Sequence, residues 1–230
     1  MTTPESIPPT ARTRAQQADE TKSRVLAAAV DLIEAHGEAG MRVTDVATRA
    51  KVSVGTIYTH FADRDDLVSA ARLEQFLGAV HLDVDSIAGA VNGATSSADL
   101  VHRLREVSRI ASDPARADNR WRRAEILGTA RSRPQLAERI GVSQHETNQA
   151  LAEIARAGQV RGVIDAAVDP MALGIMVQAF TFGLVLADID PDSTLDPTAW
   201  LDVVTRFTTA ITPAGAGAEE AATGKIAQNP

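Results

Sequence analysis

The chain has 230 residues, 44% of them hydrophobic, which is enough to bury a core of domain size. It contains no cysteine, and this excludes a disulfide framework and a thiolate metal site. The N-terminal sequence MTTPESIPPTARTR lacks the apolar segment of a secretion signal, so we expect a cytoplasmic protein. The net charge of −7 argues against indiscriminate binding to nucleic acid.

The charge is unevenly distributed along the chain. Residues 12–64 include eight basic and seven acidic residues, a net charge of +1, so the rest of the chain carries −8. The N-terminal segment can therefore approach a polyanion, whereas the remainder repels one.

Almost every segment between residues 19 and 211 has apolar residues at helical spacing, and none alternates as a strand does. We therefore predict an all-α protein of about nine helices. Residues 1–18 and 212–230 have little to bury and are predicted to be a disordered arm and tail. Between them we predict a compact helical domain at residues 19–65 and a larger helical bundle at residues 66–211.

The predicted helices of the first domain follow one another closely. One face of the first helix carries four apolar residues: Leu26, Ala29, Val30 and Ile33. Asp19 is predicted to cap this helix and Gly37 to end it. Two short helices follow at residues 43–50 and 54–61, and a longer one runs from residue 63 to about His81.

A turn-rich segment, residues 84–97, leads into the second domain. The helices predicted there span residues 97–112, 115–130, 134–157, 170–188 and 197–211. Ser97 is predicted to cap the first of them, and Pro170 and Pro197 stand in the first turns of the last two.

The segment VTDVATRAKVSVGTIYTHF, residues 43–61, has the pattern of a helix-turn-helix. Two short amphipathic helices are separated by KVS, the short connection that this motif requires. Helical spacing brings six apolar side chains together as a small core: Val43, Val46, Ala47, Val52, Ile57 and Phe61. On the second helix, Gly55 and Thr59 then point away from this core. Thr56 and Tyr58 flank them on the exposed side.

This exposed face suits the major groove of DNA. A glycine lets the backbone approach closely, threonines offer methyl groups and hydroxyls to base edges or phosphates, and Tyr58 and His60 can donate to phosphate oxygens. Ser53 is placed to cap the helix, whose N-terminal amides add to a phosphate contact. Arg64, at the start of the next helix, is placed for a neighbouring phosphate.

From Thr21 to Leu67 the sequence resembles the N-terminal domain of the TetR (tetracycline-repressor-like) family of bacterial transcriptional regulators. The resemblance rests on the order and spacing of an amphipathic helix ending in HGEAG, the segment VTDVATRAKVSVGTIYTHF and the segment ADRDDL. The run typical of the family, GVS-x-GT-φ-Y-x-x-F followed by a basic and an acidic residue, is present as VSVGTIYTHFADRDDL.

Three positions depart from the family pattern. Lys51 stands where Gly is usual in the turn, so it must adopt a less favourable backbone conformation, but it adds a cation near DNA. Val54 stands where Lys is frequent, and Lys51 can replace the phosphate contact that is lost. Arg42 stands where Ser or Thr commonly caps the helix.

The resemblance implies a homodimer that binds a palindromic operator, with the remaining helices dimerising and binding a small molecule. We therefore expect a repressor released by a small, largely apolar effector, without a cofactor; the alternative is a helical adaptor that does not bind specific DNA. The predicted DNA-binding residues are Thr44, Lys51, Ser53, Val54, Gly55, Thr56, Tyr58, Thr59, His60 and Arg64.

Residues 133–162 resemble a second helix-turn-helix, since LAERIGVS mimics a turn. One continuous helix explains the same spacing, with steps of four and three between Leu136, Ile140, Ser143, Thr147, Leu151, Ile154 and Gly158. The nearby Glu138, Glu146 and Glu153 also disfavour phosphates. We favour the continuous helix, in which Gly141 costs about 1 kcal/mol.

The last two helices fit a dimer interface because small residues recur at helical spacing. The predicted interface residues are Ala172, Ile175, Ala179, Gly183, Trp200, Val203, Val204 and Phe207. The alternative for the same residues is a core within one chain. A ligand pocket is expected among the middle helices, with the candidates Phe76, His102, Trp121, Arg122, Glu125, Leu127, Met176, Gln178 and Phe180.

Neither an enzyme nor a membrane protein is expected. The sequence has no P-loop, no glycine-rich dinucleotide turn and no His pair at metal-binding spacing. His81, Asp83 and Asp85 lie close together, but their spacing near a helix end is typical of a loop rather than a metal site. The apolar run at residues 171–187 is just short of the roughly 18 residues of a membrane span, so it predicts a helix buried on most sides.

Overall fold

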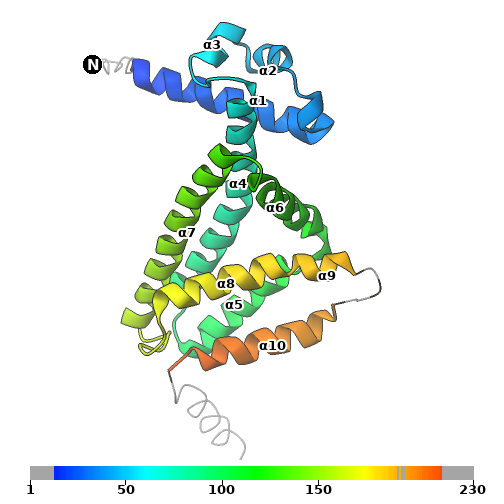
Figure 1. The fold of residues 1–230 in the computed structure, drawn as a ribbon. Helices are drawn as coiled ribbons and strands as arrows, with labels where there is room; N and C mark the ends of the chain where they lie inside the picture. The colour runs from blue at the N-terminus through cyan, green and yellow to red at the C-terminus, as the bar shows by residue number, and fades with distance from the viewer. Residues whose placement is uncertain (1–12, 191, 193–194, 214–230) are drawn as a thin grey trace, which may run out of the picture. The chain divides into compact units, whose positions relative to one another are not determined.

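The structure is a computed structural model that describes residues 13–190, 192 and 195–213. The described residues form helices and connecting turns without a strand, which confirms the predicted all-α fold (Figure 1). Contacts divide the chain into two compact units, unit 1 (Met1–Gln75) and unit 2 (Phe76–Pro230). The predicted domain boundary after residue 65 stays a prediction, because the helix that begins at Arg64 contributes to both units.

The first helix, α1 (Arg14–Gly40), begins earlier than the sequence predicted. The Thr13 hydroxyl accepts from the Gln16 amide at 3.3 Å, and the Gln16 side chain accepts from the Thr13 amide at 2.9 Å. This capping box satisfies two amides that a helix start leaves unpaired, so the cap predicted at Asp19 is wrong. Of the predicted arm, residues 13–18 are described and helical from Arg14, and residues 1–12 lie outside the described residues. Residues 214–230 of the predicted tail also lie outside them.

Unit 1 is built around one apolar core, to which α2 (Val43–Ala50), α3 (Val54–Tyr58) and the start of α4 (Arg64–Gly93) contribute with α1 (Figure 1). Of the six predicted core residues, Val46, Ala47, Ile57 and Phe61 are buried, while Val43 and Val52 pack at the edge. The predicted helix-turn-helix core is therefore confirmed. At Gly37 the backbone leaves the helical conformation (φ 70°, ψ 171°), so the predicted end of α1 is a kink that glycine permits.

Unit 2 contains the rest of α4 and the helices that follow it. Their bounds are α5 (Ser97–Ala111), the 3-10 turn η1 (Pro114–Arg116), α6 (Ala117–Ala130), α7 (Pro134–Val160), α8 (Pro170–Gly183), α9 (Val185–Ile189) and α10 (Pro197–Ala210). Pro170 and Pro197 occupy first turns, as predicted. The cap of α5 is Ser96 rather than Ser97, since the Ser96 hydroxyl accepts from the Asp99 amide at 3.1 Å.

Helix α4 continues to Gly93, past its predicted end at His81 and through most of the segment predicted to be turns. Ile87, Ala90 and Val91 follow helical spacing and are buried in unit 2. Their burial outweighs the cost of a glycine in this part of the helix, about 1 kcal/mol, which is why residue propensity alone misplaced the helix end.

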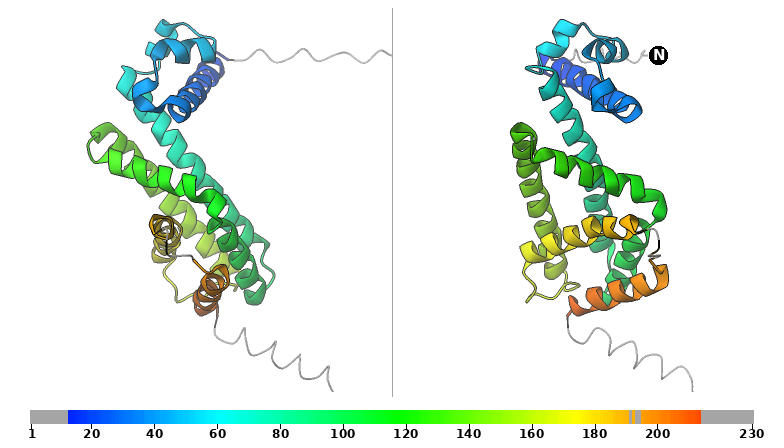
Figure 2. Two further views of the ribbon diagram at one scale, coloured as in Figure 1. Left: turned by 90° about the vertical axis from the view of Figure 1, so that its right-hand side faces the viewer. Right: turned by 45° about the vertical axis from the view of Figure 1, so that its right-hand side comes forward.

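The helices of unit 2 pack in pairs, α8 against α7 and α10 against α5 (Figures 1 and 2). Helix α7 is continuous, which confirms the single predicted helix and excludes a second helix-turn-helix at residues 133–162. Gly174 allows α8 to approach α7 closely, because a Cβ there would lie 3.0 Å from the Cβ of Leu151.

The apolar helix α8 is more exposed than the sequence predicted. Within the described residues, Pro170–Ile189 is the one segment long and apolar enough, by length and composition, to cross a membrane. Only 22% of the apolar stretch in this segment is buried within the chain. Leu173 and Gly174 are buried, whereas Ile175 and Met176 are 51% and 45% exposed. The prediction of a helix buried on most sides is wrong, since the described neighbours cover only part of its surface.

Candidate nucleic-acid interface and ligand cavity

The turn between α2 and α3 is closed by hydrogen bonds. Lys51 adopts the left-handed conformation (φ 56°, ψ 49°), and the next amide, of Val52, donates to the Ala47 carbonyl at 3.0 Å. The Ser53 hydroxyl then accepts from the Thr56 amide at 3.0 Å and starts α3. The unfavourable backbone predicted at Lys51 and the cap predicted at Ser53 are both confirmed.

Helix α3 turns one face to the core and the other to solvent. Ile57 is completely buried, whereas the adjacent Tyr58 is 47% exposed. Lys51, Gly55 and Thr59 are exposed on the outer side as well. Within the described part of the chain, neither the Tyr58 hydroxyl nor the Lys51 ammonium group has a hydrogen-bond partner, so both can bind an external group.

Several other hydroxyls of this face are already bonded inside the motif. The Ser53 and Thr56 oxygens lie 2.8 Å apart, and the Thr59 hydroxyl donates to the Thr56 carbonyl at 2.7 Å. The Thr44 hydroxyl, on α2, donates to Asp45 Oδ1 at 3.4 Å. The Thr44 and Thr59 protons and one proton of the Ser53–Thr56 pair are therefore used inside the motif, whereas the side chains of Lys51 and Tyr58 have no hydrogen-bond partner among the described residues.

Three further predicted residues border this face. Val54 is half-buried and packs against the core of unit 1. His60 is also half-buried, with its ring 6.5 Å from the ring of Phe61. At Gly55 a Cβ would meet only the Ser53 hydroxyl, at the ordinary distance of 3.6 Å, so the fold itself does not require glycine there.

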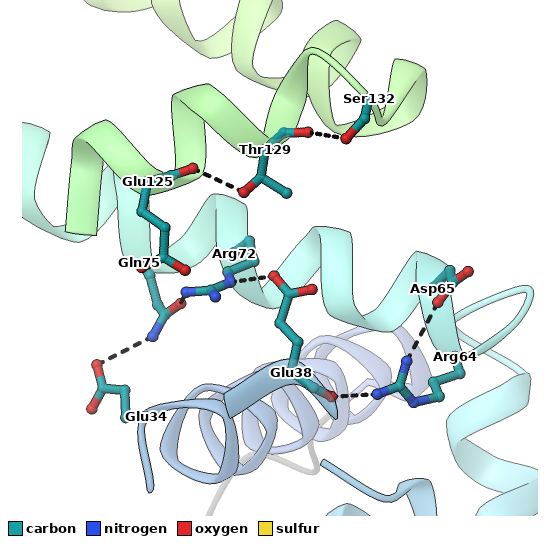
Figure 3. A network of polar contacts seen from close by, with 9 residues as sticks. All are labelled: Glu34, Glu38, Arg64, Asp65, Arg72, Gln75, Glu125, Thr129 and Ser132. Atoms are coloured by element: carbon teal, nitrogen blue, oxygen red, sulfur yellow. Dashed lines mark hydrogen bonds and ion pairs between the residues drawn. The ribbon is translucent and has the colours of Figure 1, made fainter. Parts of the chain in front are cut away.

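Arg64 is engaged within unit 1 (Figure 3). Its Nε and Nη2 donate to the Met41 carbonyl at 3.3 Å, Nη2 also donates to the Glu38 carbonyl, and Nη1 lies 3.5 Å from Asp65. Nearby, Arg72 donates to the Glu38 carboxylate at 2.7 Å. Arg64 thus adds donors to carbonyls at the end of α1, where a helix leaves such groups short of partners, and few of its donors remain for a phosphate.

The fold and this outward-facing motif define a class: all-α proteins with an N-terminal helix-turn-helix that binds DNA. Residues 25–71 match the family model of the bacterial regulatory proteins of the tetR family. Residues 25–71 of unit 1 are therefore similar to the TetR-family N-terminal domain, which confirms the resemblance found in the sequence.

The relatives are similar in sequence over a short stretch of the chain and in fold over most of it. An HTH-type transcriptional repressor of Mycobacterium tuberculosis is 38% identical over 52 residues, which are 23% of this chain and 28% of the relative's own length. A Rhodococcus sp. structure described as a TetR-family transcriptional regulator has a TM-score of 0.59 at 22% identity, covering 85% of this chain and 100% of that one. FadR from Bacillus subtilis, in complex with stearoyl-CoA, has a TM-score of 0.51 at 18% identity, covering 81% and 97%.

Unit 2 holds a cavity of about 90 Å³, which we call the apolar cavity, between α4, α5, α8 and α10. Its apolar lining includes Leu104, Val107, Phe180, Trp200, Val204 and Phe207. The hydroxyls in its wall are bonded within the protein: the Ser108 oxygen accepts from Trp200 Nε1 at 3.0 Å, and Thr208 donates to the Val204 carbonyl at 2.8 Å. The wall therefore suits an apolar molecule.

Of the predicted pocket residues, Phe180 lines this cavity. Trp121 and Met176 are both 45% exposed, and Phe76 packs beside the guanidinium of Arg123. Gln178 belongs to an amide cluster between α7 and α8, where its Nε2 donates to Asn148 Oδ1 at 2.6 Å. The remaining candidates lie on α5 or α6 outside the cavity lining: His102, Arg122, Glu125 and Leu127.

The structure divides the predicted interface residues into two groups. Trp200, Val204 and Phe207 line the apolar cavity. Ala172, Ile175, Ala179 and Val203 are exposed, and Gly183 is half-buried. The sequence contained an indication that the first group packs within the chain. Leu100, Leu104 and Val107 on α5 have the same spacing of four and three residues as the first group on α10, as expected of two helices that face each other.

A charged cluster, here called the arginine cluster, lies beside the apolar cavity and comprises Arg116, Arg120, Arg123, Asp83 and Asp188. Arg120 Nε and Nη2 donate to Asp188 at 2.6 and 2.7 Å, and this bond holds the pKa of Asp188 below its ordinary value. Arg116 and Arg123 each lie 3.2 Å from one oxygen of Asp83. Asp83, considered above for a metal site, is thus an arginine partner, and the described residues contain no group of three or more metal ligands.

Arg123 is the least satisfied member of the arginine cluster. It is 8% exposed, and its Cζ lies over the rings of Phe76 and Phe182, 5.7 and 5.9 Å from their centroids. Its Nε is buried and has no hydrogen-bond partner among the described residues. Burial lowers the pKa of Arg123, and the nearby Asp83 carboxylate partly offsets this.

Proposed function

We propose that this protein is a DNA-binding transcriptional repressor that binds a palindromic operator as a homodimer and is released by a small, largely apolar effector. The observation that carries the proposal is the outer face of α3 within the region that matches the tetR family model. There, Lys51 in the turn and Tyr58, which follows the buried Ile57, present donors without a partner among the described residues. Unused donors on a rigidly anchored helix are what phosphate contacts require.

Within this proposal the residues of the motif have different roles. Lys51 and Tyr58 donate to phosphates, and Thr44, Thr56 and His60 are further residues for DNA contacts. Gly55 lets the backbone approach the bases, which gives a reason for a glycine that the fold does not need. Ser53, Val54 and Thr59 position α3, and Arg64 holds the end of α1 rather than a phosphate.

The second copy in the proposed dimer covers the exposed side of α8. On this side of α8, Ala172, Ile175 and Ala179 recur at helical spacing and are exposed. Val203 of α10 is 53% exposed. Exposed apolar residues on one helix face fit an interaction site. A two-fold dimer also places two recognition helices for the two halves of a palindrome.

The proposed effector site is the apolar cavity. Its lining belongs to α4, α5, α8 and α10, and α4 is the helix that also contributes to unit 1. A molecule that changes the position of α4 can therefore change the affinity for DNA. The stearoyl-CoA bound by FadR is an example of a ligand in this fold.

The experiment measures binding of the full-length protein to promoter DNA from its own gene neighbourhood by fluorescence anisotropy at several salt concentrations. Tyr58→Ala is expected to weaken specific binding by about tenfold or more, because a hydrogen bond to a charged group is lost. Trp121→Ala is the matched control, since Trp121 is an equally exposed aromatic on α6. Absence of salt-sensitive, sequence-preferring binding by the wild type would refute the proposal and favour a helical adaptor.

A further inference from the structure

Two cavities in unit 2 share part of their walls. The apolar cavity and a smaller one of about 20 Å³ are both lined by Ala111 and Thr181. The smaller cavity is lined otherwise by polar groups, including Asp83 and the guanidinium groups of the arginine cluster. One molecule can therefore place an apolar body in the first cavity and a polar head in the second.

Arg123, in the wall of the smaller cavity, has a buried donor without an acceptor among the described residues. Arg123 Nε is fully buried and unpaired among the described residues, while Nη1 of the same side chain is held by Asp83 at 3.2 Å. Leaving a buried charged donor unpaired is costly, so native proteins supply an acceptor for such a group. The space of about 20 Å³ accommodates one oxygen atom of a head group or one water.

The charges of the cluster favour an anion over a water. Three arginines face two aspartates, which leaves one positive charge, and Arg120 and Arg123 are both buried. A water can satisfy the unpaired Nε, but it leaves the buried charge uncompensated. An anionic oxygen satisfies both, and a planar guanidinium is well suited to a carboxylate.

We propose that the effector is an organic carboxylate, with its apolar body in the apolar cavity and its carboxylate at Arg123. This inference rests on the proposed effector site and specifies the chemical class of its ligand. It explains in one step why a buried, incompletely paired arginine adjoins a cavity whose own hydroxyls are already bonded.

The test compares ligands that share an apolar body, and uses the full-length protein. Octanoate, 1-octanol and octylamine are titrated by calorimetry, together with the fluorescence of Trp200, which lines the cavity. Octanoate is expected to bind roughly tenfold or more tightly than 1-octanol, because a charge-assisted hydrogen bond is added, and octylamine is expected to bind most weakly.

Arg123→Met keeps the volume of the side chain and removes the donor and the charge. It is expected to lower the affinity for octanoate by a similar factor and to leave 1-octanol binding unchanged, which also shows an intact cavity. Arg206→Met is the control, since Arg206 is exposed on α10. If Arg206→Met and Arg123→Met lower the affinity for octanoate equally, the assignment of the carboxylate to Arg123 is wrong.

The outcomes separate the inference from the proposed function. If 1-octanol binds as tightly as octanoate to the wild type and lowers its DNA affinity, the effector cavity stands and the carboxylate site is refuted, with a water as the partner of Arg123. If none of the three ligands binds, both the effector cavity and its ligand class are refuted. Should Arg123→Met fail to fold, the preference of the wild type for octanoate over 1-octanol decides alone.

Discussion

At the scale of single residues, Arg64 shows how the same side chain can serve the fold or the ligand. The sequence predicts that Arg64 contacts a phosphate, because it closely follows the recognition helix. In the structure its guanidinium binds the Met41 and Glu38 carbonyls, so its main effect is on the stability of unit 1. The free donors of Lys51 and Tyr58 make these two residues the stronger candidates for DNA contacts.

Arg64→Gln is therefore expected to lower the free energy of unfolding by about 2 kcal/mol, because charge-assisted hydrogen bonds to part-buried carbonyls are lost. Urea denaturation measures this change. The salt dependence of DNA binding is expected to stay as in the wild type, since no phosphate contact is removed. Arg42→Gln, at an exposed position before α2 without a capping bond, is the control and is expected to be near neutral in stability. A salt slope reduced by about one with unchanged stability would instead support the phosphate contact.

At the scale of elements, the pairing of α7 with α8 depends on where glycines lie. Gly174 faces α7, and a Cβ there would come within 3.0 Å of Leu151. Gly141 lies in the middle of α7 with no atom within 4 Å of an added Cβ. The two glycines therefore have opposite roles in helices of the same pair.

Gly141→Ala is expected to raise the free energy of unfolding by about 0.5–1 kcal/mol, because alanine is the better helix former and meets no neighbour. Gly174→Ala is expected to lower it by about 1–3 kcal/mol, because the added methyl group separates α8 from α7. Thermal or urea unfolding of the two variants and the wild type measures both changes in the free energy of unfolding. Equal stabilisation by both substitutions would show that α8 does not pack on α7 at this distance.

At the scale of the whole molecule, the proposed dimer connects the exposed side of α8 with DNA binding. Only 22% of the apolar stretch within Pro170–Ile189 is buried, which is unfavourable in water unless another molecule packs on it. We propose that this molecule is a second copy of the chain. Palindromic DNA then requires both copies, so loss of the dimer must also weaken operator binding.

Ile175→Glu, which places a charge on this side, is expected to convert the dimer to a monomer and to lower operator affinity at least tenfold. Light scattering after size-exclusion chromatography measures the mass, and anisotropy measures DNA binding. Val142→Glu, at a valine 58% exposed on α7, is the matched control and should remain dimeric. A dimeric Ile175→Glu protein would place the interface elsewhere, and wild-type protein that partitions into vesicles as a monomer would favour a membrane as the cover.

The amino-acid sequence alone determined the helix-turn-helix. Its core, its cap at Ser53 and its strained turn at Lys51 depend on residues that are at most a few turns apart, so spacing and residue type suffice. Periodicity also determined the continuous α7. The first cap lay outside the predicted helix because Thr13 and Gln16 form a local capping box that apolar spacing does not reveal.

Only the tertiary structure decided what the apolar residues of unit 2 do. Trp200 and Ile175 both lie on apolar helical stripes, yet Trp200 lines a cavity and Ile175 is exposed, because α5 covers the stripe of α10 while α7 covers only one side of α8. The role of Arg123 was also decided only by the tertiary structure. It is one of the three arginines of the arginine cluster, and it is the one whose Nε is buried without a partner among the described residues. Burial and pairing depend on which helices meet, and residues 30 or more positions apart set this through packing rather than through local spacing.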